Sequence, residues 1–298
     1  MSERRTPRPH LRHYLQAALA LPLWGLFAVL PVEAASALGA ALLRTFGPLT
    51  KPHRIARDNL RRAFPTKDEA EITAILRAMW DNLGRNVGEL PHLAAIADPR
   101  NGRITVEGLE HLEAVRDDGR PGLFFSGHLA NWELMPFIIQ QAGLRLHVFY
   151  RAPNNPLVDR LFRKVHAGGA GELLPKGREG ARRSLELLRE GEHLGVLVDQ
   201  KMNDGIPVPF FGRDAMTAPA LAQLAVKFDA PVVPMRITRT TGCRFRAVFE
   251  APVPMVTTAT GKVDLAASMT AVNARLEAWI TDRPEQWLWV HRRWPKGS

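Results

Sequence analysis

The sequence predicts an α/β fold in which a central, mostly parallel sheet is flanked by helices, preceded by an N-terminal membrane-anchoring helical segment. Three observations carry this prediction. Strand-like and helix-like segments alternate from residue 104 onward, a long uncharged stretch lies near the N-terminus, and 46% apolar residues in 298 can bury a sizeable core. No repeat or Ser/Gly-rich linker interrupts the chain, so we expect an anchor over residues 1–50 and one domain over residues 51–298.

The anchor prediction rests on residues 13–32, which carry no formal charge. Twenty helical residues span about 30 Å, one bilayer core. Pro22 and Pro31 interrupt a straight helix, so an embedded or re-entrant segment competes with full crossing. The basic residues before the stretch place the N-terminus in the cytoplasm: Arg4, Arg5, Arg8 and Arg12. A cleaved signal peptide and a packed soluble helix are the alternatives, although "VEAASALGAALL" continues without a clear cleavage site.

The next segment, "FPTKDEAEITAILRAMWDNLGRNVGEL", predicts an amphipathic helix. Thr66 and Glu69 have the spacing of a capping box. Apolar residues then recur at helical spacing as far as Leu90, which indicates a core-facing stripe.

The alternating region supplies the sheet and its covering helices. The segments typical of strands are "ITVEGLE", "GLFFS", "RLHVFY", "GAGELLP", "HLGVLVDQ", "PVVPMRITR" and "RFRAVFEAP". The segments typical of helices are "NWELMPFIIQQAG", "NPLVDRLFRKVHAG", "REGARRSLELLREG", "APALAQLAVKFDA" and "DLAASMTAVNARLEAWITDRP". Parallel sheets gather their sites at the carboxyl ends of strands. His128, Arg151 and the pair Asp199–Gln200 each follow a predicted strand, so we expect a site there.

Charge and motifs narrow the function. Forty Lys and Arg against 30 Asp and Glu give a net charge of +10, which favours an acidic partner such as nucleic acid, an anionic membrane or an acidic carrier protein. The basic residues are dispersed instead of clustered between aromatics, so we expect no nucleic-acid partner. A basic membrane-surface scaffold is the non-enzymatic alternative.

Several catalytic classes lack their motifs. "FFSGH" has no glycine two positions before Ser126, no phosphate-binding P-loop occurs, and "GGAGELL" is incomplete as a dinucleotide fingerprint. The histidines form no H-E-x-x-H pair, and the single Cys243 excludes a Cys-based zinc site. We therefore expect no metal ion and no cofactor.

The segment "HLANWE", residues 128–133 and here called the box, places His128 and Glu133 five positions apart. In one continuous helix the two residues would lie about 140° off a common face. If His128 precedes the helix and Glu133 lies in its first turns, the carboxylate can hold one imidazole nitrogen while the other accepts a proton. This spacing also arises by chance, with a structural or exposed histidine as the alternative. Its position after a strand favours catalysis.

An ordered set of segments resembles the late acyltransferases of lipid A biosynthesis, the lauroyl and myristoyl transferases of Gram-negative bacteria. These segments are "NLRRAFP", "MWDNLGR", "GHLANWE", "YRAPNNPLVD", "VDQ", "VPFFGRDAMTAPALAQLA" and "PEQWLWVHRRW". The resemblance covers nearly the whole chain. Glycerol-phosphate and lysophospholipid acyltransferases are wider relatives and share the box, so the box alone is less specific than the ordered set.

The resemblance implies an inner-membrane enzyme whose active site faces the cytoplasm. It would transfer a fatty acyl group from acyl carrier protein to a hydroxyl of a lipid A precursor. His128 would be the general base and Glu133 its orienting partner, with no acyl-enzyme. The alternative is a lysophospholipid or other glycolipid O-acyltransferase that uses acyl-CoA or acyl carrier protein.

The resemblance also implies substrate-binding residues: Asn131, Arg151, Asn155, Asp199, Gln200 and Arg292. Each has a plainer alternative. Arg151 is otherwise a surface or capping residue, Asn155 a helix cap before Pro156, and Asp199 an ion-pair partner of Arg151. Arg292 and Arg293 are candidates for lipid phosphates. The tryptophans of the same C-terminal stretch are either core residues or an interfacial belt.

Overall fold

The sheet of the computed structural model, which describes residues 10–169 and 171–295, follows the predicted alternation. It has seven strands in the order β1-β9-β8-β2-β5-β3-β4. Their bounds are β1 Ile104–Glu107, β2 Leu123–Ser126, β3 Leu146–Tyr150, β4 Leu173–Pro175, β5 His193–Leu197, β8 Val232–Thr241 and β9 Arg244–Phe249. All neighbours are parallel except β8 and β9. The prediction of a mostly parallel sheet flanked by helices is confirmed.

The helices of the α/β region lie between or after these strands. They are α6 Leu109–Asp117, α7 Met135–Gln141, α8 Pro156–His166, α9 Arg178–Arg189, α10 Ala220–Phe228 and α11 Leu265–Asp282, with short 3₁₀ turns at η3 Pro99–Asn101, η4 Trp132–Leu134 and η5 Pro284–Gln286. The helix expected from Asn131 instead begins as η4 and becomes α-helical only at Met135. The box therefore lies in a loop and a 3₁₀ turn, outside any long helix.

One hairpin was not predicted. β6 (Ile206–Phe210) and β7 (Arg213–Thr217) form a separate antiparallel pair. Pro207 and Pro209 argue against a strand because proline cannot donate to a ladder. Both prolines are exposed here, and an edge strand leaves one side of its backbone unpaired, so they are tolerated.

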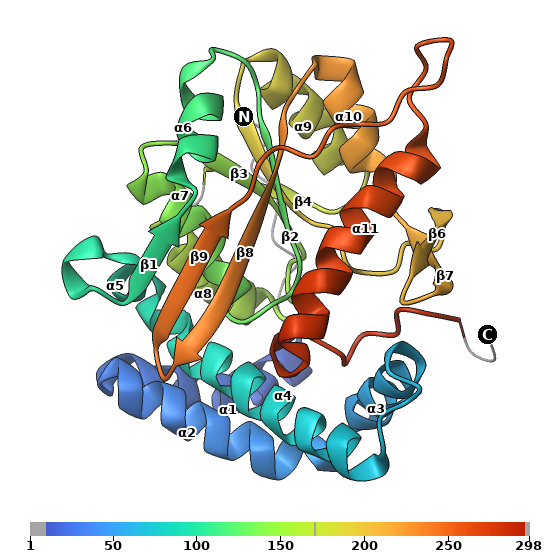
Figure 1. Cartoon of the computed structure of the whole chain (residues 1–298). Helices are drawn as coiled ribbons and strands as arrows, with labels where there is room; N and C mark the ends of the chain where they lie inside the picture. Colours follow the sequence, from blue (N-terminus) through green and yellow to red (C-terminus); the bar gives the residue numbers. More distant parts are fainter. Residues whose placement is uncertain (1–9, 170, 296–298) are drawn as a thin grey trace.

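The remaining helices precede the first strand of the sheet in the chain. They are α1 Leu11–Val29, α2 Val32–Phe46, η1 Gly47–Leu49, α3 Lys51–Ala63, α4 Glu69–Glu89, η2 Leu90–His92 and α5 Leu93–Ala97. Figure 1 shows α1 to α4 together at the end of the sheet toward which β8 runs. Since β2, β5 and β3 run parallel to β8, their carboxyl ends also point toward this layer.

The predicted amphipathic helix is α4, but its cap lies two residues later than expected. Asp68 accepts a hydrogen bond from Glu71 N at 2.8 Å, and the Glu71 carboxylate accepts one from Asp68 N at 2.9 Å. The sequence holds two overlapping pairs with capping-box spacing. Thr66 is part of a turn in which Lys67 N donates to Phe64 O, so the helix starts from the second pair.

The predicted anchor is not supported as a crossing helix. Among the described residues, no helix combines the length and the apolar content needed to span a bilayer. The uncharged stretch is divided at Leu30 and Pro31 into α1 and α2. Of the arginines that predict the orientation, those at positions 4, 5 and 8 lie outside the described residues.

Helix α2 packs closely along α4, and glycines permit the approach. A Cβ atom added to Gly84 would lie 2.2 Å from Gly39 O, and one added to Gly88 would lie 2.1 Å from Ala35 O. Both distances are far below van der Waals contact, so only glycine fits. The N-terminal helices are thereby joined to the helix that, as described next, supports the box.

Candidate active site

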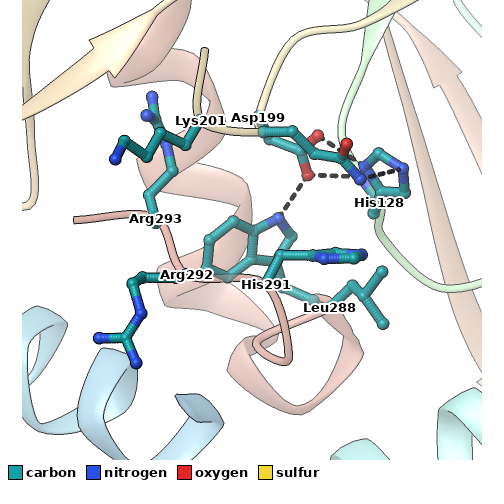
Figure 2. Close-up of a pocket in the computed structure, with 9 residues that line it drawn as sticks. His128, Asp199, Lys201, Leu288, His291, Arg292 and Arg293 are labelled. Carbon is teal, nitrogen blue, oxygen red and sulfur yellow. Dashed lines mark hydrogen bonds and ion pairs between the residues drawn. The ribbon is translucent and has the colours of Figure 1, made fainter. Parts of the chain in front are cut away.

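Two of the predicted strand-end residues meet, as expected. β2 and β5 are neighbours in the sheet, and His128 and Asp199 follow them at the carboxyl end. Figure 2 shows both side chains beside a small pocket, together with His291 and Arg292 from the C-terminal segment (residues 286–295). The pairing of His128 with Asp199 decides the chemistry available here.

Asp199 binds both the ring and the backbone of His128. Its Oδ1 accepts from His128 Nδ1 at 2.7 Å, while its Oδ2 accepts from His128 N and from Trp287 Nε1, each at 2.6 Å. Burial opposes the charged carboxylate, but the charge of His128 and the donated hydrogen bonds outweigh it and lower the pKa of Asp199 to about 2. The carboxylate is ionised at neutral pH. In the neutral form of the ring, His128 Nδ1 therefore carries the proton, and Nε2 is left as an acceptor.

Nε2 of His128 contacts Gln200, the other residue predicted at the end of β5. The distance from Gln200 Nε2 to His128 Nε2 is 3.1 Å, so the amide donates to the basic nitrogen. Gln200 Oε1 in turn accepts from Lys176 Nζ at 3.3 Å. Lys176 directly follows β4, which neighbours β3.

Glu133 has a different partner from the one expected. Its Oε2 accepts from His166 Nε2 at 2.6 Å and its Oε1 from Trp132 Nε1 at 2.9 Å. The assignment of Glu133 as orienting partner of His128 is not confirmed, because Asp199 makes the Nδ1 hydrogen bond. The reason is the backbone: His128 lies in the loop after β2, within reach of the end of β5, whereas Glu133 lies in η4 and meets α8.

The His166–Glu133 contact is an ion pair. His166 Nδ1 bonds Phe162 O at 2.8 Å, so both ring nitrogens have acceptors. Burial disfavours the charge on each side chain, but the hydrogen bond between them and their opposite charges outweigh it. The pKa of Glu133 is lowered and the pKa of His166 is raised.

The box backbone is fixed from behind by α4 and the C-terminal segment. Ala130 has a φ of 46°, a left-handed conformation that non-glycine residues rarely adopt. Its N donates to Gln286 O at 2.8 Å, and its carbonyl accepts from Asn82 at 3.3 Å and from Asn86. On the other side of the loop, Leu288 N donates to His128 O at 3.0 Å. These bonds hold the strained turn and the direction of the histidine.

A buried ion pair underlies this arrangement. Arg239 Nη1 lies 2.5 Å from Glu89 Oε1, and Nη2 lies 3.0 Å from Oε2. Asn131 is fully buried, and its amide donates to Glu89 Oε2 at 2.8 Å. The structure thus places Asn131 behind the box, where it positions the loop. Its predicted contact with substrate finds no support in this geometry.

The comparison with known proteins identifies the family of the chain. The chain matches the bacterial lipid A biosynthesis acyltransferase family over residues 1–296. It belongs to this family. The motif resemblance is confirmed, and the protein is an acyltransferase of lipid A biosynthesis.

Three relatives are similar over most of the chain. A lipid A biosynthesis acyltransferase of Haemophilus influenzae is 25% identical over 297 residues, 93% of this chain and 90% of that protein. Lipid A biosynthesis acyltransferase 2 of Shigella flexneri is 24% identical over 247 residues, covering 80% and 76%. A lipid A biosynthesis lauroyltransferase of Escherichia coli is 26% identical over 250 residues, covering 80% and 78%.

The other predicted site residues of this acyltransferase divide between pocket and scaffold. Asn155 is buried and caps α8, accepting from Leu157 N at 3.0 Å, so the capping alternative is confirmed. Arg151 is exposed, and within the described part of the chain it forms no ion pair with Asp199. Its charge nevertheless contributes to lowering the pKa of Lys176, after burial, so the two cations lie close together.

The "HRRW" stretch separates into one pocket arginine and one structural arginine. Arg292 lines the pocket. Arg293 is buried and donates to Met216 O at 2.9 Å and to Thr217 Oγ1 at 2.8 Å, so it cannot reach a lipid phosphate in this arrangement. The tryptophans are buried, which confirms the core alternative: Trp287, Trp289 and Trp294.

Sequence reasoning missed four contributors. The sequence predicts Trp287 only as a core or interfacial residue, whereas its indole also donates a hydrogen bond to Asp199. Lys176 follows the predicted strand "GAGELLP" and could have been found by the same strand-end rule that selected His128. Arg239 and Glu89 lie within a strand and a helix, and nothing in their local sequence indicates a buried ion pair.

The His166–Glu133 pair predicts a pH-dependent stability. The pKa of His166 is raised in the folded protein. The ion pair therefore stabilises the fold fully at pH values below the pKa of His166 in the unfolded chain, about 6.5. This stabilisation is lost as the pH rises through the pKa of His166 in the folded protein. His166→Gln should therefore lower the thermal midpoint more at about pH 6 than at about pH 9. His111→Gln on α6 is the control. Equal losses at both pH values would show that the pair is not ionic.

Proposed function

We propose that this acyltransferase moves a fatty acyl group from the thioester of acyl carrier protein to a hydroxyl of a lipid A precursor, with His128 as general base. The observation that carries the proposal is the buried carboxylate of Asp199 against His128 Nδ1. It fixes the tautomer and leaves Nε2 to take a proton from the acceptor. A positioned base of this kind contributes about 10² to 10⁴ in rate.

The reaction needs no covalent intermediate on the protein. The acceptor hydroxyl gives its proton to His128 Nε2 while its oxygen bonds to the thioester carbonyl carbon. The resulting tetrahedral intermediate collapses, the carbon–sulfur bond breaks, and the thiolate takes the proton back from the imidazolium. The products are the new ester and the thiol of the carrier.

Two carboxylates then have separate roles in the proposal. Asp199 orients His128, because it binds both the ring and the backbone of that residue. Glu133, expected from the sequence to do this, keeps the far side of the box in place through Trp132 and His166. Its contribution to catalysis is indirect in this assignment.

Charge supports the choice of substrates. Acyl carrier protein is acidic and the lipid A precursor carries phosphates, whereas this chain has a net charge of +10. Arg151 and Arg292 lie near or in the pocket and are proposed to meet these anionic groups. Gln200 is proposed to contact the reacting groups, because its amide already reaches His128 Nε2.

A transfer assay tests the reaction. Purified protein in detergent is offered lauroyl or myristoyl carrier protein with a tetraacylated lipid A precursor, and in a second tube with a lysophospholipid. Mass spectrometry should find one added acyl group on the precursor. His128→Ala should lower the rate by about 10²-fold or more, and His111→Ala is the control. Transfer only to the lysophospholipid would assign the alternative acceptor, and no transfer to either would contradict the proposal.

The same assay separates the two carboxylates. Asp199→Asn removes the charge that holds the proton on His128 Nδ1 and should lower kcat by about 10² to 10⁴. Glu133→Gln should leave more activity than Asp199→Asn, with a lower thermal midpoint from loss of the His166 ion pair. The reverse order of activities would return the orienting role to Glu133.

We also propose that the α1–α4 layer lies on the inner membrane with the site on the cytoplasmic side, and exposed apolar side chains support its contact with lipid. Val29 at the end of α1 is 80% exposed and Leu49 in η1 is 81% exposed. Phe46 at the end of α2 is also exposed, and Lys51 and Arg54 of α3 follow. Apolar side chains beside basic ones suit an anionic lipid surface.

Vesicle sedimentation tests this surface. The double variant Val29→Asp and Leu49→Asp should bind vesicles containing anionic phospholipid about tenfold or more weakly, because burial of each apolar side chain is worth about 1.5 kcal/mol or more. Val226→Asp, at an exposed valine of α10, should bind like the wild type. Undiminished binding of the double variant would mean that another surface contacts lipid.

A further inference from the structure

Two positive side chains lie close to the His128 site. They are Arg151 after β3 and Lys176 after β4, and His291 of the C-terminal segment lies near both. After burial and the charge of His128, the charges of Arg151 and Lys176 lower the pKa of His291, as expected for close neighbours. Lys176 is connected to His128 by two hydrogen bonds in series: Lys176 donates to the Gln200 amide oxygen, and the Gln200 amide nitrogen donates to His128 Nε2.

Acyl transfer requires a donor for the oxyanion of the tetrahedral intermediate. The first backbone N–H groups of the box already have acceptors: those of residues 128, 129 and 130 donate to Asp199 Oδ2, Gly127 O and Gln286 O. Side-chain donors beside His128 Nε2 are therefore the candidates. Gln200 Nε2 is 3.1 Å from that nitrogen, and Lys176 Nζ is 3.3 Å from the other end of the same amide.

We propose that Lys176, together with the amide of Gln200, donates hydrogen bonds to the oxyanion and is a catalytic residue of this reaction. The inference rests on the proposed acyl transfer. When the acceptor hydroxyl binds His128 Nε2, it takes the place of the Gln200 amide. The amide N–H and the ammonium group are then free to meet the thioester carbonyl oxygen beside the hydroxyl.

The charge of Lys176 acts mainly in the transition state. As the new carbon–oxygen bond forms, the carbonyl π electrons move to the oxygen, which changes from neutral to negative. When the intermediate collapses, that electron pair re-forms the carbonyl and the thiolate leaves with the proton from His128. An ammonium group therefore stabilises the intermediate more than the bound thioester, which raises kcat more than it lowers KM.

The surroundings of Lys176 give this role a pH signature. Partial burial and the charge of Arg151 lower the pKa of Lys176, while Asp199 opposes them. Gln200 accepts a hydrogen bond from Lys176, and the charge of Lys176 contributes to lowering the pKa of the nearby His291. Because the charged form is the donor, kcat should fall as the pH rises through the pKa of Lys176. An arginine at this position stays charged and should remove the fall.

The experiment measures kcat, and KM for each substrate, on the full-length protein against pH. Lys176→Met should lower kcat by about 10² to 10³, with KM changed by less than about threefold. Lys176→Arg should keep kcat within about tenfold of the wild type and should lose its alkaline fall. Lys227→Met on α10 is the matched control and should behave like the wild type.

The outcomes separate the inference from the proposed function. Three results would each overturn the role of Lys176 while leaving acyl transfer in place. Lys176→Met could keep the wild-type kcat, or it could raise KM without lowering kcat. Lys176→Arg could keep the fall of kcat at alkaline pH. A lysine that only positioned Gln200 would not move the alkaline limb. A wild-type protein inactive on both acceptors would overturn the proposed function and the inference together. The hydrogen bond of Lys176 to Gln200 lies at the surface of the protein, so Lys176→Met should keep the wild-type thermal midpoint.

Discussion

The buried ion pair between Arg239 and Glu89 is the constraint on which the site depends. It joins β8 to α4, and both side chains are buried. Removing one member of such a pair costs about 3–5 kcal/mol, because the other charge is left unpaired. Neighbouring groups add hydrogen bonds to both charges: Ser36 and Asn131 donate to the Glu89 carboxylate, and the Arg239 guanidinium donates to Asn82, Asn86 and the carbonyl of Gly242. Asn82 and Asn86 of α4 also donate hydrogen bonds to the carbonyl of Ala130 in the box, so the direction of His128 follows from the packing of α4.

Asp199 connects this scaffold to the chemistry. Its carboxylate, at the end of β5, accepts three hydrogen bonds: two from His128 in the loop after β2 and one from Trp287 in the C-terminal segment. Because the carboxylate is buried and ionised, each of these bonds is stronger than a comparable bond at the surface. The base is oriented before any substrate arrives, which is the condition under which a general base is effective.

Glu133 performs the matching task on the other side of the box. Its ion pair with His166 holds the box against α8. Helix α8 in turn packs on α1, where the rings of Trp24 and Phe162 lie 6.3 Å apart. The helix proposed to contact the membrane is therefore mechanically linked to the site. Both carboxylates have a lowered pKa, but they bind different partners: Asp199 binds His128, and Glu133 binds His166.

The sequence by itself determined the α/β alternation, the seven strands of the sheet, and the placement of His128, Asp199 and Gln200 after strands. These are local properties, readable from apolar periodicity and from the rule that parallel strands end at one edge. Only the tertiary structure decided the pairings. Asp199 lies 71 positions from His128, and His166 lies 33 from Glu133. Strand order determines which strand end adjoins which, and local periodicity contains no information about that order. For the same reason, spacing within the box suggested Glu133 as the partner of His128, whereas the adjacency of β2 and β5 gave that position to Asp199.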